Sequence, residues 1–212
     1  MGGALPLALA AGWTLARGRF PGRGALALAL NMPLVLPPVV TGWLLLLVLG
    51  VQGPIGALLD AWLGVRLAFT TAGAAVACGT MVFPVLARSA RLAFEAADPQ
   101  LEAAARSLGA GRLDRLLTVT LPLAAPGVLA GMALAYAQSL GEFGAVITFA
   151  ASIPGQTQTL PLAIFAALQV PGGEGRAARL ALASIVLAVA GLGLAEWIGR
   201  RVNRWLGRGG GR

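Results

Sequence analysis

Long apolar stretches constrain the fold of this chain more than any other feature of its sequence. An α-helix needs about 20 mostly apolar residues to cross the roughly 30 Å hydrocarbon core of a bilayer. Only 11% of the residues are charged, whereas a soluble domain carries about 25%. The pattern predicts an all-α polytopic membrane protein, with residues 1–212 forming a single transmembrane domain of about five spans. The predicted spans are Gly2–Ala16, Ala25–Gly50, Leu67–Phe94, Leu121–Ala151 and Ala177–Ile198.

Two apolar stretches are too short to cross a bilayer alone. Gly2–Ala16 would reach only about 22 Å as a helix, and it has neither a basic leader nor a small-residue cleavage site. We therefore expect it to be the second half of a spanning helix whose start lies upstream, rather than a signal peptide. Leu160–Val170 is predicted to be a re-entrant or interfacial helix.

The arginines predict the orientation. The chain has a net charge of +8, and all sixteen of its basic residues are arginine. Such charge could suit nucleic acid, but in a membrane protein it favours loops on the cytoplasmic side, so no nucleic-acid partner is expected. Three arginines fall on one side: Arg66, Arg176 and Arg179. Thirteen fall on the other, predicting a multi-pass inner-membrane protein with a cytoplasmic C-terminus: Arg17, Arg19, Arg23, Arg88, Arg91, Arg106, Arg112, Arg115, Arg200, Arg201, Arg204, Arg208 and Arg212.

Several kinds of chemistry are excluded by the residues that the sequence lacks. Without lysine there is no phosphate-binding P-loop, and without histidine there is neither a histidine base nor a histidine metal ligand. Cys78 is the only cysteine and is expected to be a small packing residue. The chain is therefore not expected to be an enzyme by itself, nor to hold a cofactor or metal.

Proline is concentrated in the second apolar stretch. Pro37 and Pro38 remove backbone donors, and Asn31 and Thr41 lie nearby in the sequence. Because carbonyls freed inside a bilayer must be buried in protein or face water, this pattern is typical of a helix that lines a cavity. A kinked packing helix is the alternative.

Small residues repeat every four positions in the fourth stretch, at Gly127, Gly131 and Ala135. This spacing gives a smooth helix face for close packing. The partner is predicted to be another helix of the same subunit or a helix of a second subunit.

The longest polar segment in mid-chain, residues 95–120, predicts a helix–turn–helix. Asp98-Pro99 starts the first helix as N-cap and N1 residues, and the glycine pair around Ala110 ends it. A second short helix is expected over Arg112–Thr118. The Ala-rich face of the first helix suits the groove of another protein, although an amphipathic helix resting on lipid headgroups is the alternative.

This segment resembles the EAA loop of ABC-importer permeases. In that family a Glu-Ala-Ala triplet precedes a glycine, and Leu-Pro follows. Gly109 and Leu121-Pro122 keep the spacing, whereas Ala103 stands where the glutamate is usual and Glu102 lies one position earlier. The resemblance implies two cytoplasmic coupling helices that dock on an ATPase. The residues carried over are Glu102, Ala103, Ala104, Ala105, Gly109, Ala110, Leu121 and Pro122.

Further segments resemble the molybdate branch of this family, with Gly-Glu-Phe-Gly-Ala shared with the sulfate branch. They are MPLVLPPVV from Met32, SLGEFGAVITF from Ser139, IPGQTQTLP from Ile153 and PGGEGRAARL from Pro171. The resemblance implies a homodimer that imports molybdate, or possibly tungstate. It also implies a cytoplasmic ATPase dimer that uses ATP-Mg, and an external molybdate-binding protein. Sulfate or another oxyanion is the alternative substrate.

An oxyanion path is expected to use neutral polar groups, since strong fixed positive charge would hold a dianion too tightly. Glu142 would repel an anion and is predicted to cap the Phe143–Phe149 segment or to have a paired structural role near the outer gate. The predicted path residues are Asn31, Pro37, Pro38, Thr41, Gln138, Ser139, Glu142 and Thr148. Two other classes compete: an ion-driven secondary transporter, which would favour internal repeats and acid relays, and a membrane scaffold, which leaves the coupling loop unexplained.

Overall fold

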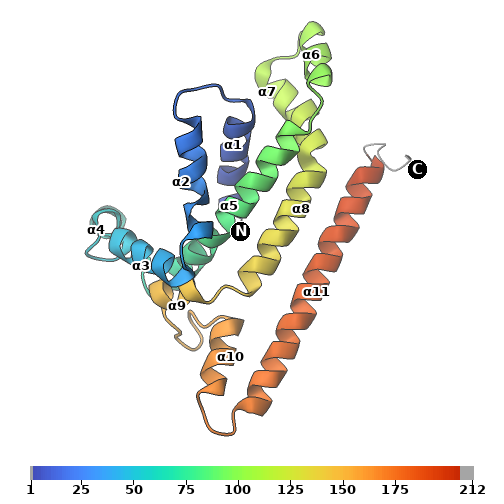
Figure 1. Ribbon diagram of the computed structural model, residues 1–212. Helices are drawn as coiled ribbons and strands as arrows, with labels where there is room; N and C mark the ends of the chain where they lie inside the picture. Colours follow the sequence, from blue (N-terminus) through green and yellow to red (C-terminus); the bar gives the residue numbers. More distant parts are fainter. Residues whose placement is uncertain (1, 206–212) are drawn as a thin grey trace.

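A computed structural model describes residues 2–205, which contain helices and no strands (Figure 1). The predicted all-α fold is confirmed. A π-helical turn, Leu116–Thr120, joins α7 to α8. The α-helices are α1 (Ala4–Arg17), α2 (Arg23–Val35), α3 (Pro38–Leu49), α4 (Pro54–Leu63), α5 (Thr71–Glu95), α6 (Pro99–Ser107), α7 (Arg112–Arg115), α8 (Leu121–Leu140), α9 (Gly144–Ala150), α10 (Leu160–Leu168) and α11 (Glu174–Trp205).

Three helical segments of the described part are long and apolar enough to cross a membrane: Thr71–Glu95, Arg112–Leu140 and Glu174–Val202. If the bent pair α2 and α3 counts as one span, the described part has up to four candidate spans. The first predicted stretch forms α1, which has only 14 residues. The predicted short helix at 160–170 is present as α10, which packs against α11 (Figure 1).

The predicted span Ala25–Gly50 is divided into α2 and α3, which meet at an angle of 115° and form either one broken span or a re-entrant pair. The last turn of α2 closes with the Leu36 N–H donating to Met32 O. Pro37 and Pro38 have no N–H to continue that ladder, and Pro38 instead starts α3 at its first position. The proline pair therefore turns the chain and lays α3 across the end of the bundle.

The predicted stretch Leu121–Ala151 is also divided. Helix α8 ends at Leu140, and α9 begins at Gly144 after a short break. Helix α9 packs against α3 and α5, and its Val146 and Phe149 are fully buried in the largest core cluster. Both helices are apolar, so the sequence shows no drop in hydropathy at the break. Helix α8 belongs to a candidate span, whereas α9 is part of the core.

Close helix packing centres on α5, which lies between α1 and α8 (Figure 1). A Cβ atom placed on Gly127 would lie 2.7 Å from Ala93 Cβ, and one on Gly131 would overlap Ser89 Cβ. Ala135 is fully buried in the next turn. The smooth face predicted on the fourth stretch therefore packs against α5 of the same subunit.

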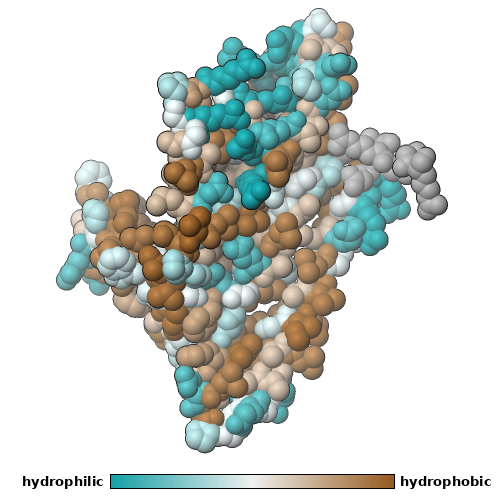
Figure 2. Space-filling view, viewed as in Figure 1, coloured by the Kyte–Doolittle hydropathy of each residue, from teal (hydrophilic) through white to brown (hydrophobic). Residues whose placement is uncertain are grey.

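Most of the arginines in residues 2–205 gather at one end of the molecule. Toward this end lie the α1–α2 loop, the end of α5, helices α6 and α7 and the end of α11. Figure 2 shows hydrophilic residues there.

An ion pair lies in the loop after α4, away from this end. Arg66 pairs with Asp60 at 3.0 Å, and the hydrogen bond and the charge of Asp60 raise the pKa of Arg66. Arg208 and Arg212 lie outside the described residues.

Candidate functional site

The first helix of the polar loop is formed as its sequence predicts. The Asp98 carboxylate accepts a hydrogen bond from the Gln100 N–H at 2.8 Å, and Pro99 occupies the first turn. Gly109 has a φ of +88°, which favours glycine, and the Ala110 N–H donates to Ala105 O. The cap at one end and the left-handed glycine at the other thus set the length of α6.

Glu102 connects α6 to two other elements. Its carboxylate pairs with Arg17 Nη2 of α1 at 2.7 Å and accepts a hydrogen bond from Thr120 Oγ1 at 3.0 Å. Arg17 Nη2 also donates to Ala97 O at 3.5 Å. Since both members of the ion pair are only about a quarter exposed, this contact ties the loop to the end of α1 and to the start of α8. Sequence reasoning gave Glu102 no such role.

The three alanines of α6 do not share one face. Ala103 and Ala104 are exposed, whereas Ala105 is half-buried. Leu101 and Leu108 lie on the side of Ala104, at helical positions i, i+3 and i+7, and are 48% and 87% exposed. We call Leu101, Ala104 and Leu108 the apolar face of α6. It has the composition of a surface that another protein covers.

The second predicted coupling helix is not separate from the span. Helix α7, the π-turn and α8 form one continuous helix, Arg112–Leu140. Pro122 cannot donate to a carbonyl one turn earlier, and just before it the Leu121 N–H bonds to Leu116 O in the wider π register. Helix α7 is therefore joined to the start of α8 without an intervening loop.

Some predicted path residues meet where α3 packs against α9. Pro38 lies beside Gly144, and Gly42 beside Thr148. Thr41 is only 5% exposed, and among residues 2–205 its hydroxyl has no hydrogen-bond partner. Thr148 Oγ1 donates to Gly144 O at 2.8 Å, within its own helix. Pro37 forms the turn before α3. Thr41 is therefore packed between helices, whereas Pro37 and Pro38 are exposed.

The remaining polar candidates lie elsewhere. Gln138 Nε2 donates to Met81 O of α5 at 3.2 Å. Ser139 Oγ donates to Tyr136 O, and Asn31 Nδ2 donates to Ala27 O, both within their own helices. The structure thus does not bring the eight predicted path residues together in one site.

Glu142 caps a helix, one of the two roles predicted for it. Its Oε1 accepts a hydrogen bond from the Ala145 N–H at 2.9 Å, in the first turn of α9. Only 7% of the residue is exposed. A carboxylate at a helix N-terminus is stabilised by the free N–H groups there. The cap therefore explains a buried acid without any contact with substrate.

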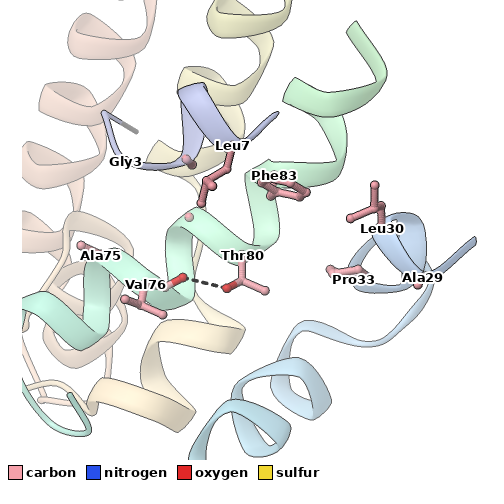
Figure 3. A pocket seen from close by; sticks show the side chains of 11 residues that line it. Gly3, Leu7, Ala29, Leu30, Pro33, Ala75, Val76, Thr80 and Phe83 are labelled. Carbon is pink, nitrogen blue, oxygen red and sulfur yellow. Dashed lines mark hydrogen bonds between the residues drawn. The ribbon is translucent and has the colours of Figure 1, made fainter. Parts of the chain in front are cut away.

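Two cavities follow the groove between α2 and α5. The first, about 520 Å³ and open also to α1, is lined by apolar side chains such as Leu7, Leu30 and Phe83 (Figure 3). Its Thr80 hydroxyl donates to Val76 O in the same helix. The second, about 320 Å³, shares Leu30 and has both apolar and polar walls; we call it the arginine cavity, because Asn31, Arg88 and Arg91 form its polar side. Sequence reasoning used these arginines only for orientation.

Comparisons with known proteins agree on the relationship of this chain. Residues 4–204 match the family of binding-protein-dependent transport system inner membrane components. The chain is 49% identical over 204 residues to the molybdenum transport system permease protein ModB of Escherichia coli (strain K12), covering 96% of this chain and 89% of that protein. It is 46% identical over 205 residues to ModB of Haemophilus influenzae (97% and 90% covered). The sulfate transport system permease protein CysT of Salmonella typhimurium is 37% identical over 193 residues (90% and 69% covered).

Proposed function

Because this chain belongs to the family of binding-protein-dependent transport system inner membrane components, we propose that it is the membrane-spanning permease of an ATP-driven importer of molybdate. The observation that carries the proposal is near full-length similarity to molybdenum permeases, at 49% and 46% identity. A sulfate permease is more distant, at 37%. Tungstate is a tetrahedral dianion like molybdate, and the proposal includes it as a second substrate.

The proposal requires a separate ATPase. The chain has no lysine for a P-loop, so ATP-Mg would bind to a cytoplasmic ATPase dimer. The exposed apolar face of α6 supplies a docking surface, and the Glu102 ion pair with Arg17 would carry its movement to α1. An external molybdate-binding protein would deliver the anion at the opposite end.

A second copy of this chain is part of the proposal. Helix α2 has no buried residue in the described structure. In α11, only 6% of an apolar 18-residue stretch is buried inside the subunit. Lipid can cover part of this surface, but one subunit leaves the groove along α2 and α5 open. Two subunits that rock around a shared path would give alternating access.

Uptake in a deletion strain tests the substrate. Expression of this chain with its cognate ATPase and binding protein should restore growth that depends on trace molybdate, and uptake of radiolabelled molybdate should require ATP. Tungstate should inhibit molybdate uptake at concentrations similar to that of molybdate, whereas sulfate should inhibit it only at a far higher concentration. Uptake driven by an ion gradient without the ATPase, or selective uptake of sulfate, would contradict this assignment.

Cysteine labelling tests the orientation. With Cys78 replaced by alanine, Gly172→Cys in the α10–α11 loop should react with a membrane-impermeant maleimide in intact cells. A cysteine in the Gly207–Gly211 tail, which lies outside the described residues, should react only after the cells are opened, because the arginine-rich end faces the cytoplasm. Labelling with the opposite sidedness would reject a cytoplasmic C-terminus.

A further inference from the structure

We propose that the arginine cavity binds a tetrahedral oxyanion through Arg88, Arg91 and Asn31. The inference deepens the proposed function and rests on it. The cavity has a volume of about 320 Å³ and is bounded by α1, α2 and α5. A four-oxygen anion fits this volume with room for water, whose share of liquid volume is about 30 Å³ per molecule.

The position of the arginines inside a spanning helix supports a binding role. Arg88 lies seven residues before the end of α5 at Glu95, which places it about 10 Å along the helix axis from that end. Ionisable residues within a membrane span are costly and commonly mark an ion pathway. Within residues 2–205, no carboxylate forms an ion pair with Arg88. Arg88 is exposed in the single subunit, so its guanidinium is accessible to an incoming anion.

The charge around the cavity is balanced for release as well as for binding. Arg91 Nε donates to Glu95 Oε1 at 2.8 Å, and Arg23 approaches the same carboxylate at 3.6 Å. Glu95 thus reduces the positive charge of Arg91, while that of Arg88 stays uncompensated. A dianion would meet more positive than negative charge without a fully cationic cage. This balance suits a site that must also let its ligand leave.

Asn31 adds a neutral donor from the opposite wall. One N–H of its amide is used by Ala27 O at 2.6 Å, and an amide group has a second N–H. Helix α2 thereby contributes a hydrogen-bond donor to a cavity whose charged groups come from α5. Asn31 was predicted from the sequence as a path residue, whereas its two arginine partners were not.

The neighbouring apolar cavity leaves this site at the end of the groove nearer the arginine-rich loops, which is the proposed cytoplasmic end. Apolar side chains line most of that cavity, as Figure 3 shows. Such a surface offers a dianion little compensation for lost water. The arginine cavity begins where the apolar one ends, beyond Phe83, and continues to Arg91 near the arginine-rich end. We therefore assign it to the inward-facing side of the path, where an anion would be held before release.

Equilibrium binding to the purified permease–ATPase complex tests the site. The complex is placed in nanodiscs without nucleotide or binding protein, and radiolabelled molybdate is titrated at fixed ionic strength. Arg88→Gln should raise the concentration for half-saturation of the permease site about tenfold or more, since charge-assisted hydrogen bonds are the strong ones. Arg88→Lys should retain part of the affinity. Arg19→Gln, which removes an exposed arginine from the α1–α2 loop at the same end, should bind as the wild type does.

A lipid phosphate presents tetrahedrally arranged oxygens, as the translocated anion does, and could occupy the same site. The same samples therefore also test for bound lipid. Native mass spectrometry would show whether Arg88→Gln releases a bound anionic phospholipid. Release of lipid with unchanged molybdate binding would assign the site to a headgroup. If Arg88→Gln altered neither ligand while the protein level and ATPase assembly were normal, the inference would be overturned. Failure of the wild-type complex to take up molybdate would instead reject the proposed function.

Discussion

Replacing Ala104 by glutamate should abolish molybdate uptake and co-purification of the ATPase, while the protein remains in the membrane. Ala104 lies between Leu101 and Leu108 on the apolar face of α6, and all three residues are exposed in the isolated subunit. A docked ATPase would bury a carboxylate there without a partner, at a cost of several kcal/mol. A loss of about 3 kcal/mol would weaken the complex roughly a hundredfold.

Ala103→Glu is the matched control for this experiment. It adds the same side chain to the same helix at the adjacent position, which is also exposed but lies away from Leu101 and Leu108. The EAA pattern, moreover, usually has glutamate at this position. Uptake and ATPase binding should therefore stay near those of the wild type. Equal activity of the two variants would indicate a surface helix that contacts only lipid headgroups and would remove the docking assignment.

Ala105 shows why the structure is needed to choose the substitution. The sequence places the three alanines in one small-residue segment and does not distinguish them as probes of docking. In the structure Ala105 is half-buried, and its carbonyl accepts a hydrogen bond from the Ala110 N–H. A glutamate at this position would disturb the loop itself. Loss of transport in that variant would not report on the ATPase interface.

Local signals in the sequence were sufficient to predict several elements. The Asp98 cap, Pro99 and Gly109 specify the limits of α6 through hydrogen bonds and backbone geometry over only a few residues. At Pro37-Pro38, missing N–H groups end one helix before the next one starts, whereas the sequence predicted only a cavity-lining or kinked helix within one span. The size of that bend, 115°, was not predictable, because it depends on the packing of α3 against α9.

Contacts between distant residues account for most of what the sequence did not reveal. Arg17 and Glu102 are 85 positions apart and meet only because α1 packs along α5. Arg88 and Asn31 line one cavity for a similar reason, since α2 also lies against α5. Arg88 lies within the predicted span Leu67–Phe94, unlike Arg19, but its charge was used only as a marker of orientation. The break before α9 was hidden for a different reason, because apolar composition is the same in a span and in a buried core helix.

Replacing Gly131 by leucine should prevent the subunit from folding stably in the membrane. The Cα atom of Gly131 faces Ser89 of α5 so closely that even a Cβ atom would overlap the Ser89 side chain. Both residues lie within long helices, so relief requires α5 and α8 to move apart. That movement would open the packing around Ala135 and Val82, which are both fully buried. Overpacking in a tight core costs about 1–3 kcal/mol or more, and protein stabilities are only about 5–15 kcal/mol.

Gly193→Leu supplies the comparison, because a side chain there enters open space on the exposed side of α11. Both variants add the same apolar side chain to a spanning helix, so their hydrophobicity and insertion signal are matched. Size-exclusion chromatography of a fluorescent fusion should show a monodisperse peak for Gly193→Leu and mainly aggregate for Gly131→Leu. Gly131→Ala should be intermediate, with a lowered melting temperature. If Gly131→Leu matched Gly193→Leu in yield and melting temperature, the close α5–α8 contact would not exist in the membrane, and the predicted smooth face would have to serve another partner.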